Sequence, residues 1–350
     1  MAAGRYNIIR FDERERWETA VNAIGRCDVY YYLDYCLLYQ TLGDGDPYLF
    51  VYQENECQVI YPFLKRKVQS GRLSEHFYDI TTAYGYGGPL ANCAKASFIA
   101  RFRTAFHQFC VKEKIVTEFI RFHPLLQNEN MLQSVSNVKY VRDTVYVDLT
   151  REALFDHYHP SHRRNVRKAL KAGLSFAVLK DNEAMSHLGT FVDLYYQTMQ
   201  KKAAQSYYYF PRAYFEQLIR TLSDKVMLAV VRAEGKVIAA GLFMYDGENL
   251  HYHIGCSDRN YLHMAPNNLL FHEVAQWGKE CGYKHFHLGG GYQNNDSLFR
   301  FKRGFNPTGK RRFYIGTIVH NQAVYNDLIR QWNSTNRTEL RQDFFPLYRQ

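Results

Sequence analysis

Short apolar runs separated by polar turns recur along the first half of the chain. Residues 47–67 contain two such runs about a short polar turn, which is the pattern of a β-hairpin. Another run near 76–83 precedes the loop AYGYGGPL, and apolar residues at helical spacing follow at about 95–114. Strand-like runs at 116–123 and 138–149 end this half. The pattern predicts a mostly antiparallel sheet with a helix packed against it.

The second half repeats this order of elements. A hairpin pattern turns at Glu234-Gly235 and leads to a third strand, a polar loop and a helix pattern from about 266 to 281. Strand-like runs follow at 284–288 and 311–319. Helix-like segments precede both hairpins, at about 12–24, 31–42, 182–202 and 211–222. We therefore expect an α/β (α+β) protein of two similar units, each a mixed, mostly antiparallel sheet flanked by helices.

The amino-acid composition limits the kinds of partner and the cellular compartment that we expect for this protein. The net charge of +10 favours an anionic partner, such as a phosphorylated small molecule, a nucleic acid or a membrane surface. The seven cysteines are scattered and include no C-x-x-C pair, which predicts a reducing compartment. No apolar stretch is long enough to span a bilayer, and the N-terminal sequence lacks the apolar core of a signal peptide. We expect a cytoplasmic protein with no integral membrane segment, and we leave a peripheral membrane contact open.

The start of the second-half helix favours binding of an anion. Pro266 stands at the first helical position, with Asn267 and Asn268 behind it. The N-terminus of a helix attracts phosphate through its N–H groups and its dipole. Arg259 lies just upstream, where it can pair with the same anion. An ordinary capped helix is the alternative interpretation.

A basic segment lies between the two halves. The sequence HPSHRRNVRKALKAG at 159–173 carries five Arg or Lys residues and no acid. As a helix it presents a basic patch that includes Arg163, Arg164, Arg167 and Lys168. The patch is either a solvated surface or a docking site for phosphate or RNA.

Histidines and a cysteine occupy the strand-like runs of the second half. His251 and His253 share one face of a strand, as do His285 and His287, so four imidazoles converge if these strands are neighbours. No zinc-binding spacing accompanies them, and we expect a polar cleft instead of a metal site. Cys256 has no identifiable base to activate it as a nucleophile.

The segment KHFHLGGGYQNNDSLFRFKRGF at 284–305 places three glycines ahead of a Lys-Arg pair. Glycines let the backbone turn sharply and let a substrate approach it closely. Aromatic residues flank Lys302 and are expected to hold its side chain inward. An ammonium group beside a backbone opening can stabilise an oxyanion that develops during acyl transfer.

Several segments together resemble the Fem family of peptidoglycan-bridge aminoacyltransferases and related Fem-like acyltransferases of polysaccharide clusters. They are YGYGGPL, FIRFHP, RRNVRKALKAG, YLHMAPNNLLFHEVAQWGKECGYKHFHLGGG and FKRGF. The resemblance runs from about Tyr48 to Tyr314 and implies two tandem GNAT-like acyltransferase domains. We expect the first domain over 1–148 and the second over 149–316, with a tail at about 317–350 packed on the first.

The resemblance also implies a reaction. The expected activity moves an acyl or aminoacyl group to an amine, or to a hydroxyl, of a cell-wall or polysaccharide precursor that is linked to a nucleotide or a lipid. No cofactor is expected to be tightly bound, and the co-substrate is acyl-CoA or an aminoacyl-tRNA. By motif position Lys302 stabilises the tetrahedral intermediate, and His123 and Asp296 are the candidate general bases.

Binding roles follow from the same motifs. The acyl donor is assigned to Arg259, Pro266, Asn267 and Asn268. The acceptor is assigned to Tyr84, Tyr86, Arg212, Gly290, Gly291 and Arg303. The chain departs from the peptidoglycan branch in DVYYYLDYCLLYQ, which lacks the lysine that holds a nucleotide-linked acceptor there.

Two donors and one non-enzymatic function remain open at this stage. Binding of CoA would favour an acyl-CoA-dependent enzyme, and transfer from a charged tRNA would favour a peptide-bond-forming enzyme. The alternative is a basic module that binds RNA or an anionic polymer without turnover.

Overall fold

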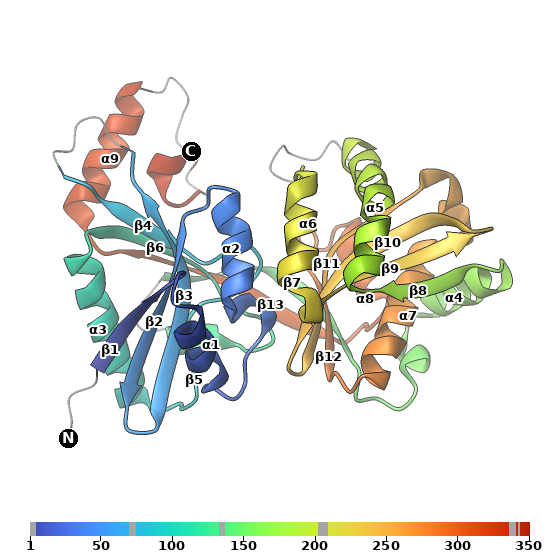
Figure 1. Cartoon of the computed structure of the whole chain (residues 1–350), viewed down its shortest axis with the longest axis horizontal. Helices are drawn as coiled ribbons and strands as arrows, with labels where there is room; N and C mark the ends of the chain where they lie inside the picture. Colours follow the sequence, from blue (N-terminus) through green and yellow to red (C-terminus); the bar gives the residue numbers. More distant parts are fainter. Residues whose placement is uncertain (1–4, 70–74, 133–136, 202–208, 336–340, 342–343) are drawn as a thin grey trace. The chain divides into compact units, whose positions relative to one another are not determined.

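The computed structural model describes residues 5–69, 75–132, 137–201, 209–335, 341 and 344–350. The chain forms two compact units, whose elements are labelled in Figure 1. Unit 1 consists of Met1–Val141 and Phe313–Gln350, and unit 2 consists of Arg142–Arg312. None of the described helices is long and apolar enough to cross a membrane.

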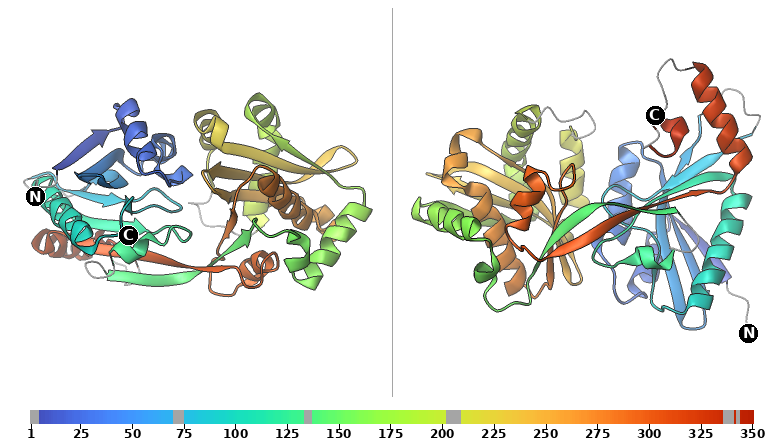
Figure 2. Two further views of the ribbon diagram at one scale, coloured as in Figure 1. Left: turned by 90° about the horizontal axis from the view of Figure 1, so that it is seen from below. Right: turned by 180° about the vertical axis from the view of Figure 1, so that it is seen from behind.

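Unit 1 is a sheet with helices on both faces. Its strands follow the order β1-β2-β3-β4-β6-β13, with β5 paired to β3, and only β4 and β6 are parallel neighbours. Helices α1 and α2 lie on one face and α3 on the other (Figure 2). The elements are β1 (Arg5–Arg10), α1 (Arg14–Asn22), α2 (Leu33–Thr41), β2 (Asp46–Glu54), β3 (Cys57–Lys67), β4 (Tyr78–Thr81), β5 (Leu90–Ala91), α3 (Ala96–Lys112), β6 (Ile115–Arg121) and α9 (Gln322–Thr335).

Phenylalanines at helical spacing on α3 form the core of unit 1. Phe98, Phe102, Phe106 and Phe109 are all buried. Alternate side chains of β2 point to this face, so the ring of Phe50 contacts the rings of Phe102 and Phe106. Burial of each ring contributes roughly 1.5–3 kcal/mol. The apolar periodicity of the sequence therefore determines where the helix packs.

Unit 2 repeats the architecture. Its strands follow the order β7-β12-β11-β10-β9-β8, and only β11 and β12 are parallel neighbours. Helices α5 and α6 cover one face, and α4 and α7 cover the other (Figure 2). The elements are α4 (Pro160–Lys171), β8 (Ser175–Leu179), α5 (Asp181–Lys201), α6 (Arg212–Thr221), β9 (Val226–Ala233), β10 (Lys236–Asp246), β11 (Asn249–Ser257), the 3-10 helix η6 (Arg259–Met264), α7 (Pro266–Glu280), β12 (His285–Gly289) and α8 (Ser297–Arg303).

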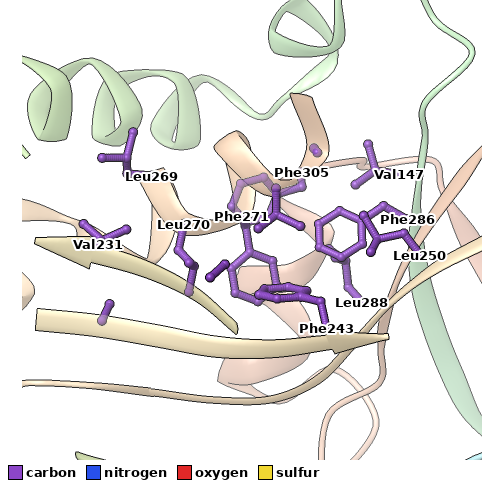
Figure 3. Close-up of a cluster of buried hydrophobic side chains, with 14 of the residues drawn as sticks. Val147, Val231, Phe243, Leu250, Leu269, Leu270, Phe271, Phe286, Leu288 and Phe305 are labelled. Carbon is purple, nitrogen blue, oxygen red and sulfur yellow. The ribbon is translucent and has the colours of Figure 1, made fainter. Parts of the chain in front are cut away.

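Aromatic rings also fill the core of unit 2, between the sheet and α7. Phe243 of β10 lies 5.8 Å from Phe286 of β12, measured between ring centroids. Phe271 of α7 lies 5.4 Å from Phe305, which follows α8 (Figure 3). These contacts fix α7 and the segment after α8 against the strands, and both segments carry residues of the candidate site.

Two long strands carry the chain between the units. The end of β7 (Asn137–Asp148) pairs with β12 in unit 2, and the end of β13 (Lys310–Val319) pairs with β6 in unit 1. The last strand of each repeat therefore completes the sheet of the other unit. The units divide at 141 and 312, whereas the sequence predicted boundaries at 148 and 316. The difference arises because hydrogen bonding, and not sequence order, decides which sheet a strand joins.

The residues after β13 pack on unit 1. Tyr325 and Leu328 of α9 form a buried cluster with Val68 and Val116. The buried carboxylate of Asp79 accepts hydrogen bonds from Arg66, at 2.6 Å, and from Arg349 near the end of the chain. The tail is thus held by both apolar contacts and an ion pair.

Candidate active site in unit 2

The strands β11 and β12 separate partway along their length. They pair only from Asn249 to His251, opposite His285 to His287, although β11 continues to Ser257 and β12 to Gly289. An irregular register between β10 and β11 at Leu242 accompanies this divergence. Beyond His251 and His287 no further residue pairs join the two described parallel strands.

A cavity of about 460 Å³ lies beside the unpaired end of β11. Residues of β11, η6, α7, α8, α5 and β10 form its wall: Gln197, Thr198, Ala240, Tyr252, Gly255, Cys256, Ser257, Asp258, Arg259, Asn260, Leu262, Asn267, Leu270, Phe271, Leu298 and Phe301. A second cavity of about 380 Å³ shares Leu262, Asn267 and Phe301 with the first. The two cavities therefore adjoin each other.

The second cavity surrounds the N-terminus of α7. Pro266 occupies the first turn of the helix, and Ala265 before it has a positive φ of 58° and no side-chain cap. Asn267 donates a hydrogen bond from Nδ2 to Ser257 Oγ at 3.1 Å. Asn268 is only 6% exposed; its Oδ1 accepts from Asn165, while its Nδ2 donates to no protein atom. A buried donor without a partner is costly, so a ligand acceptor at this helix terminus would satisfy it.

Cationic side chains stand at both cavities. Arg259 lines the larger one and is exposed. Lys168 of α4 lines the smaller one, beside Asn165. Of the predicted basic patch, Arg164 and Arg167 are also exposed, and the guanidinium of Arg167 lies 5.1 Å from the centre of the Phe155 ring. Arg163 is half-buried and lines neither cavity. The structure therefore brings one residue of the patch to the predicted donor site.

Lys302 points inward, as its aromatic neighbours predicted. It lies on α8 and is only 5% exposed. Its Nζ donates to the carbonyl oxygen of Gly290 at 2.7 Å and lies 5.2 Å from the centre of the Tyr252 ring. Tyr252 lines the larger cavity, so the ammonium group is close to the cavity wall without being part of it.

The three glycines serve to place Lys302. Gly289 has a φ of 72°, which favours glycine. A Cβ on Gly291 would lie 2.1 Å from Oδ1 of Asp296, so only glycine leaves room for that carboxylate. The carbonyl of Gly291 accepts a hydrogen bond from Arg142 at 2.5 Å. We predicted that Gly290 and Gly291 would bind the acceptor, but their carbonyls are already engaged by Lys302 and Arg142.

Asp296 caps α8, which argues against a role as general base. Its Oδ1 accepts from the N–H of Phe299 at 2.7 Å, and its Oδ2 accepts from Tyr292 at 2.7 Å and Gln293 at 3.0 Å. Burial raises the pKa of this carboxyl, but the three backbone N–H groups and nearby Lys302 outweigh burial and hold the pKa below its usual value. A carboxylate with a lowered pKa is a weak base, and we do not retain Asp296 in that role.

His123 lies in unit 1 and is fully buried there. Its Nδ1 accepts a hydrogen bond from the N–H of Leu126 at 3.2 Å, and its Nε2 lies 3.2 Å from Oδ2 of Asp28. With Nδ1 accepting, the imidazole proton belongs on Nε2, facing the carboxylate. These contacts fit a structural histidine, and His123 is likewise not retained as the base.

The predicted acceptor residues of unit 1 form an aromatic cluster. Tyr86 contacts the rings of Tyr30, His123 and Phe313, with centroid distances of 5.4–5.7 Å. The guanidinium of Arg121, which the sequence analysis did not single out, lies 5.0 Å from the Tyr84 ring centre. Because Tyr84 and Tyr86 are half-buried, their polar ends remain candidates for acceptor contacts.

The remaining predicted acceptor residues lie on helices of unit 2. Arg212 begins α6, is exposed, and forms an ion pair with Glu216 at 2.8 Å. Arg303 is exposed at the end of α8, next to Lys302 in sequence. Neither lines the two cavities, so any contact with an acceptor lies outside them.

The four histidines do not all converge. The rings of His251 and His287 are 5.5 Å apart, but His253 hydrogen-bonds to the Tyr214 hydroxyl at 2.7 Å. His285 instead hydrogen-bonds to Asn249. Burial lowers the pKa of His253 to about 4, which keeps it neutral near pH 7. Cys256 is buried and contacts two backbone carbonyls through Sγ, as expected of a structural thiol.

Sequence reasoning missed residues that position the site. His162 of α4 lies 2.8 Å, through Nε2, from the carbonyl oxygen of Phe301, and a Cβ on Gly304 would clash with its ring. Arg142 contacts the glycine loop from 149 residues away in sequence. The motif RRNVRKALKAG begins just after His162 and FKRGF ends just after Gly304, but no local pattern indicates that the two meet.

Residues 159–303 match the family model described as an acetyltransferase (GNAT) domain. No curated protein matches the chain. Among solved structures, FemX is similar over 92% of this chain and 99% of its own, with 14% identity and a TM-score of 0.68. The C-terminal domain of a putative lysylphosphatidylglycerol synthetase from Agrobacterium fabrum is similar over 89% and 93%, with 16% identity and a TM-score of 0.56.

A tandem GNAT protein from the clavulanic acid biosynthesis pathway is similar over 91% of this chain and 99% of its own, with 9% identity and a TM-score of 0.51. At these identities the likeness concerns the fold, and it agrees with the repeat of elements in units 1 and 2. The predicted pair of GNAT-like domains is confirmed. The matched segment lies within unit 2, and the chain as a whole has the tandem GNAT fold of the protein from the clavulanic acid pathway.

Proposed function

We propose that the chain is an acyltransferase whose unit 2 binds the acyl donor and carries the oxyanion-stabilising Lys302. The observation that carries this proposal is the end of pairing between β11 and β12 near a cavity that has Arg259 and Tyr252 in its wall, with Lys302 5.2 Å from the centre of the Tyr252 ring. A donor bound there presents its acyl carbonyl to β11 and its phosphate to the start of α7.

The phosphate-binding step rests on α7. The positive end of the helix dipole, the unpartnered Nδ2 of Asn268 and the cations Arg259 and Lys168 all favour a phosphate in the adjoining cavities. Both candidate donors, acyl-CoA and aminoacyl-tRNA, carry phosphate and a reactive acyl ester or thioester. The exposed basic residues of α4 extend the positive surface beyond the cavity and would favour the longer polyanion.

The proposed transfer step depends on the positions of the two bound reactants and on the positive charge of Lys302. The acceptor amine attacks the acyl carbon, the carbonyl oxygen becomes an oxyanion, and the carbon–sulfur or carbon–oxygen bond of the donor then breaks. The proton of the amine passes to the departing sulfur or oxygen. Lys302 is held by Gly290 and by the cap of α8 and does not itself line the cavity, so its ammonium group contacts the oxyanion after its side chain or the Tyr252 ring moves.

The acceptor in this proposal is an amine, or a hydroxyl, of a cell-wall or polysaccharide precursor. Support comes from the motif resemblance and from the aromatic and cationic side chains at Tyr84, Tyr86 and Arg121 in unit 1. Arg212 and Arg303 are exposed cations that can contact a nucleotide or lipid phosphate of such a precursor.

Turnover of each donor tests the proposal. Acetyl-CoA and a charged tRNA are each incubated with the protein and a nucleotide-linked amino sugar or muropeptide, and release of the acyl group is followed. We expect one donor to be used and Lys302→Met to lower the single-turnover rate about 100-fold or more, with the melting temperature nearly unchanged. Arg300→Met, an exposed cation on the same helix, is the matched control.

Two outcomes would contradict the proposal. Full turnover by Lys302→Met would remove the assigned role of the lysine. Tight, salt-dependent RNA binding without turnover of either donor would instead identify a non-catalytic binding module.

A further inference from the structure

Two cysteines of unit 1 face each other across a short antiparallel pairing that the proposed activity does not use. Val59 of β3 pairs with Ala91 of β5, and continuing the same register places Cys57 opposite Cys93. Both side chains are half-buried and neither is part of a disulfide. Their thiols are near enough to hydrogen-bond to each other.

Hydrogen bonds at the intervening position fix this register. The N–H of Asn92 donates to the carbonyl of Gln58 at 3.1 Å, and the N–H of Gln58 donates to Oδ1 of Asn92 at 2.7 Å. Nδ2 of Asn92 also donates to the carbonyl of Glu56 at 2.9 Å. The regular ladder ends at Ala91, because only one backbone hydrogen bond joins Asn92 to Gln58, so Cys57 and Cys93 lie just beyond it. The contact between the two thiols brings the sulfur atoms near enough for a disulfide to form once the side chains turn toward each other.

We propose that Cys57 and Cys93 form a reversible, redox-responsive disulfide with small-molecule disulfides such as oxidised glutathione. One thiolate attacks a sulfur of the glutathione disulfide and releases one glutathione thiolate. The second thiolate attacks the resulting mixed disulfide and releases the other. The protein loses two electrons and the glutathione disulfide gains them, so that two protein thiols and one glutathione disulfide yield one protein disulfide and two glutathiones.

The disulfide would hold a functional loop of unit 1. Cys93 ends the segment that begins at Thr82 and contains Tyr84 and Tyr86, and Cys57 begins the central strand β3. Cross-linking them closes a loop of about 36 residues in the unfolded chain, which stabilises the folded state. Oxidation is therefore expected to raise the melting temperature and to slow hydrogen exchange over 82–95.

Mass spectrometry of the full chain tests this directly. Digestion with trypsin and Glu-C leaves Cys57 alone on residues 57–65 and Cys93 alone on residues 76–95, so a cross-link between these peptides is unambiguous. After treatment with oxidised glutathione we expect that cross-linked pair, lost on reduction, as the main product. Cys57→Ser and Cys93→Ser should each abolish it and remove the rise in melting temperature.

Cys281→Ser, which removes an exposed single thiol of unit 2, is the matched control and should leave the cross-link unchanged. Separate glutathione adducts on Cys57 and Cys93 would overturn the proposal. So would two thiols that stay reduced, or a cross-link that uses another cysteine.

Discussion

Units 1 and 2 share an order of elements, but their pairs of parallel strands differ in how far they stay hydrogen-bonded. In unit 1 the parallel pair β4 and β6 stays together for the whole of β4, and the following loop continues along β6. The N–H of Thr82 donates to Phe119, and the N–H of Gly87 donates to Arg121. In unit 2 the corresponding pair, β11 and β12, separates after three residues.

The difference shows how two similar units can differ at the same position, one containing a loop of its own chain and the other lying beside a cavity. In unit 1 the loop lies at this position, because Gly85 and Gly88 allow positive φ values and Asn128 binds the carbonyls of Gly87 and Pro89. In unit 2 the chain continues from β11 into η6, and residues of η6 line both cavities described above. The proposed donor site therefore belongs to unit 2, because unit 1 contains its own backbone at the corresponding position.

Among substitutions that leave Lys302 itself in place, Gly291→Ala should have the largest effect on the site in unit 2. The new Cβ would meet the Asp296 carboxylate at 2.1 Å, displacing the cap of α8 and with it Lys302. We expect a loss of about 1–3 kcal/mol in the free energy of unfolding, as for overpacking, and a 10- to 100-fold drop in single-turnover rate. Chemical denaturation and the donor assay measure these. Gly189→Ala on α5, whose Cβ has only one neighbour at 3.8 Å, is the control and should not reduce the rate.

Substitutions of Asp296 separate capping from base catalysis. Asparagine also caps helices, but its Nδ2 cannot accept from the N–H groups of Tyr292 and Gln293, so Asp296→Asn should keep the contact to Phe299 and part of the rate. Asp296→Ala loses all three contacts and should lose about 1–2 kcal/mol of stability and much of the activity. Rates and melting temperatures of both variants provide the test. If the Asp296→Asn variant were inactive but as stable as the original protein, Asp296 would be the general base, and the capping role would not explain its effect on activity.

The two units should respond to acid over different pH ranges. In unit 2, burial lowers the pKa of His272 to about 4, so the stability it contributes above its unfolded pKa of about 6.5 is lost as the pH falls from 6.5 to 4. In unit 1, burial raises the pKa of Glu118, but Arg103 and His320 outweigh burial and lower the pKa to about 2. The stability that ionised Glu118 contributes is lost only as the pH falls from about 4.5 to 2.

Each response amounts to roughly 3 kcal/mol at its acid limit. Denaturation followed from pH 8 to pH 3 should show unit 2 weakening first, and His272→Gln should remove about half of the slope between pH 6.5 and 4, because burial lowers the pKa of His253 to about 4 as well. A variant that keeps the full slope there would contradict the assignment. Glu118→Gln is the corresponding variant in unit 1 and should leave the slope of stability between pH 6.5 and 4 unchanged.

Much of the fold could be predicted from the sequence, because strong apolar periodicity determines the central strands and the long helices. The edge strands β1 and β8 were missed. Only one residue of each is buried, and an exposed strand has little alternation to detect. Helix α8 was also missed, since seven residues are too few for a helical period to stand out.

The candidate site was predicted only where local sequence determines it. Aromatic neighbours correctly placed Lys302 inward, and Pro266 correctly marked the start of α7. The closeness of Gly291 and Asp296 was not predicted, because a glycine pattern does not reveal which atom uses the space. Arg142 and His162 were missed because their contacts join segments more than 100 residues apart.

Calorimetric titration of the protein with CoA, acetyl-CoA and a charged tRNA tests the central claim most directly. Arg259→Ala and Lys168→Ala alter the cavities of unit 2, and Lys95→Ala alters the residue before α3, the corresponding helix of unit 1. The account predicts that one donor binds, that each unit 2 variant weakens it about 10-fold, and that Lys95→Ala does not. Binding that weakens only in Lys95→Ala, or no binding of any donor, would contradict the assignment of the donor site to unit 2.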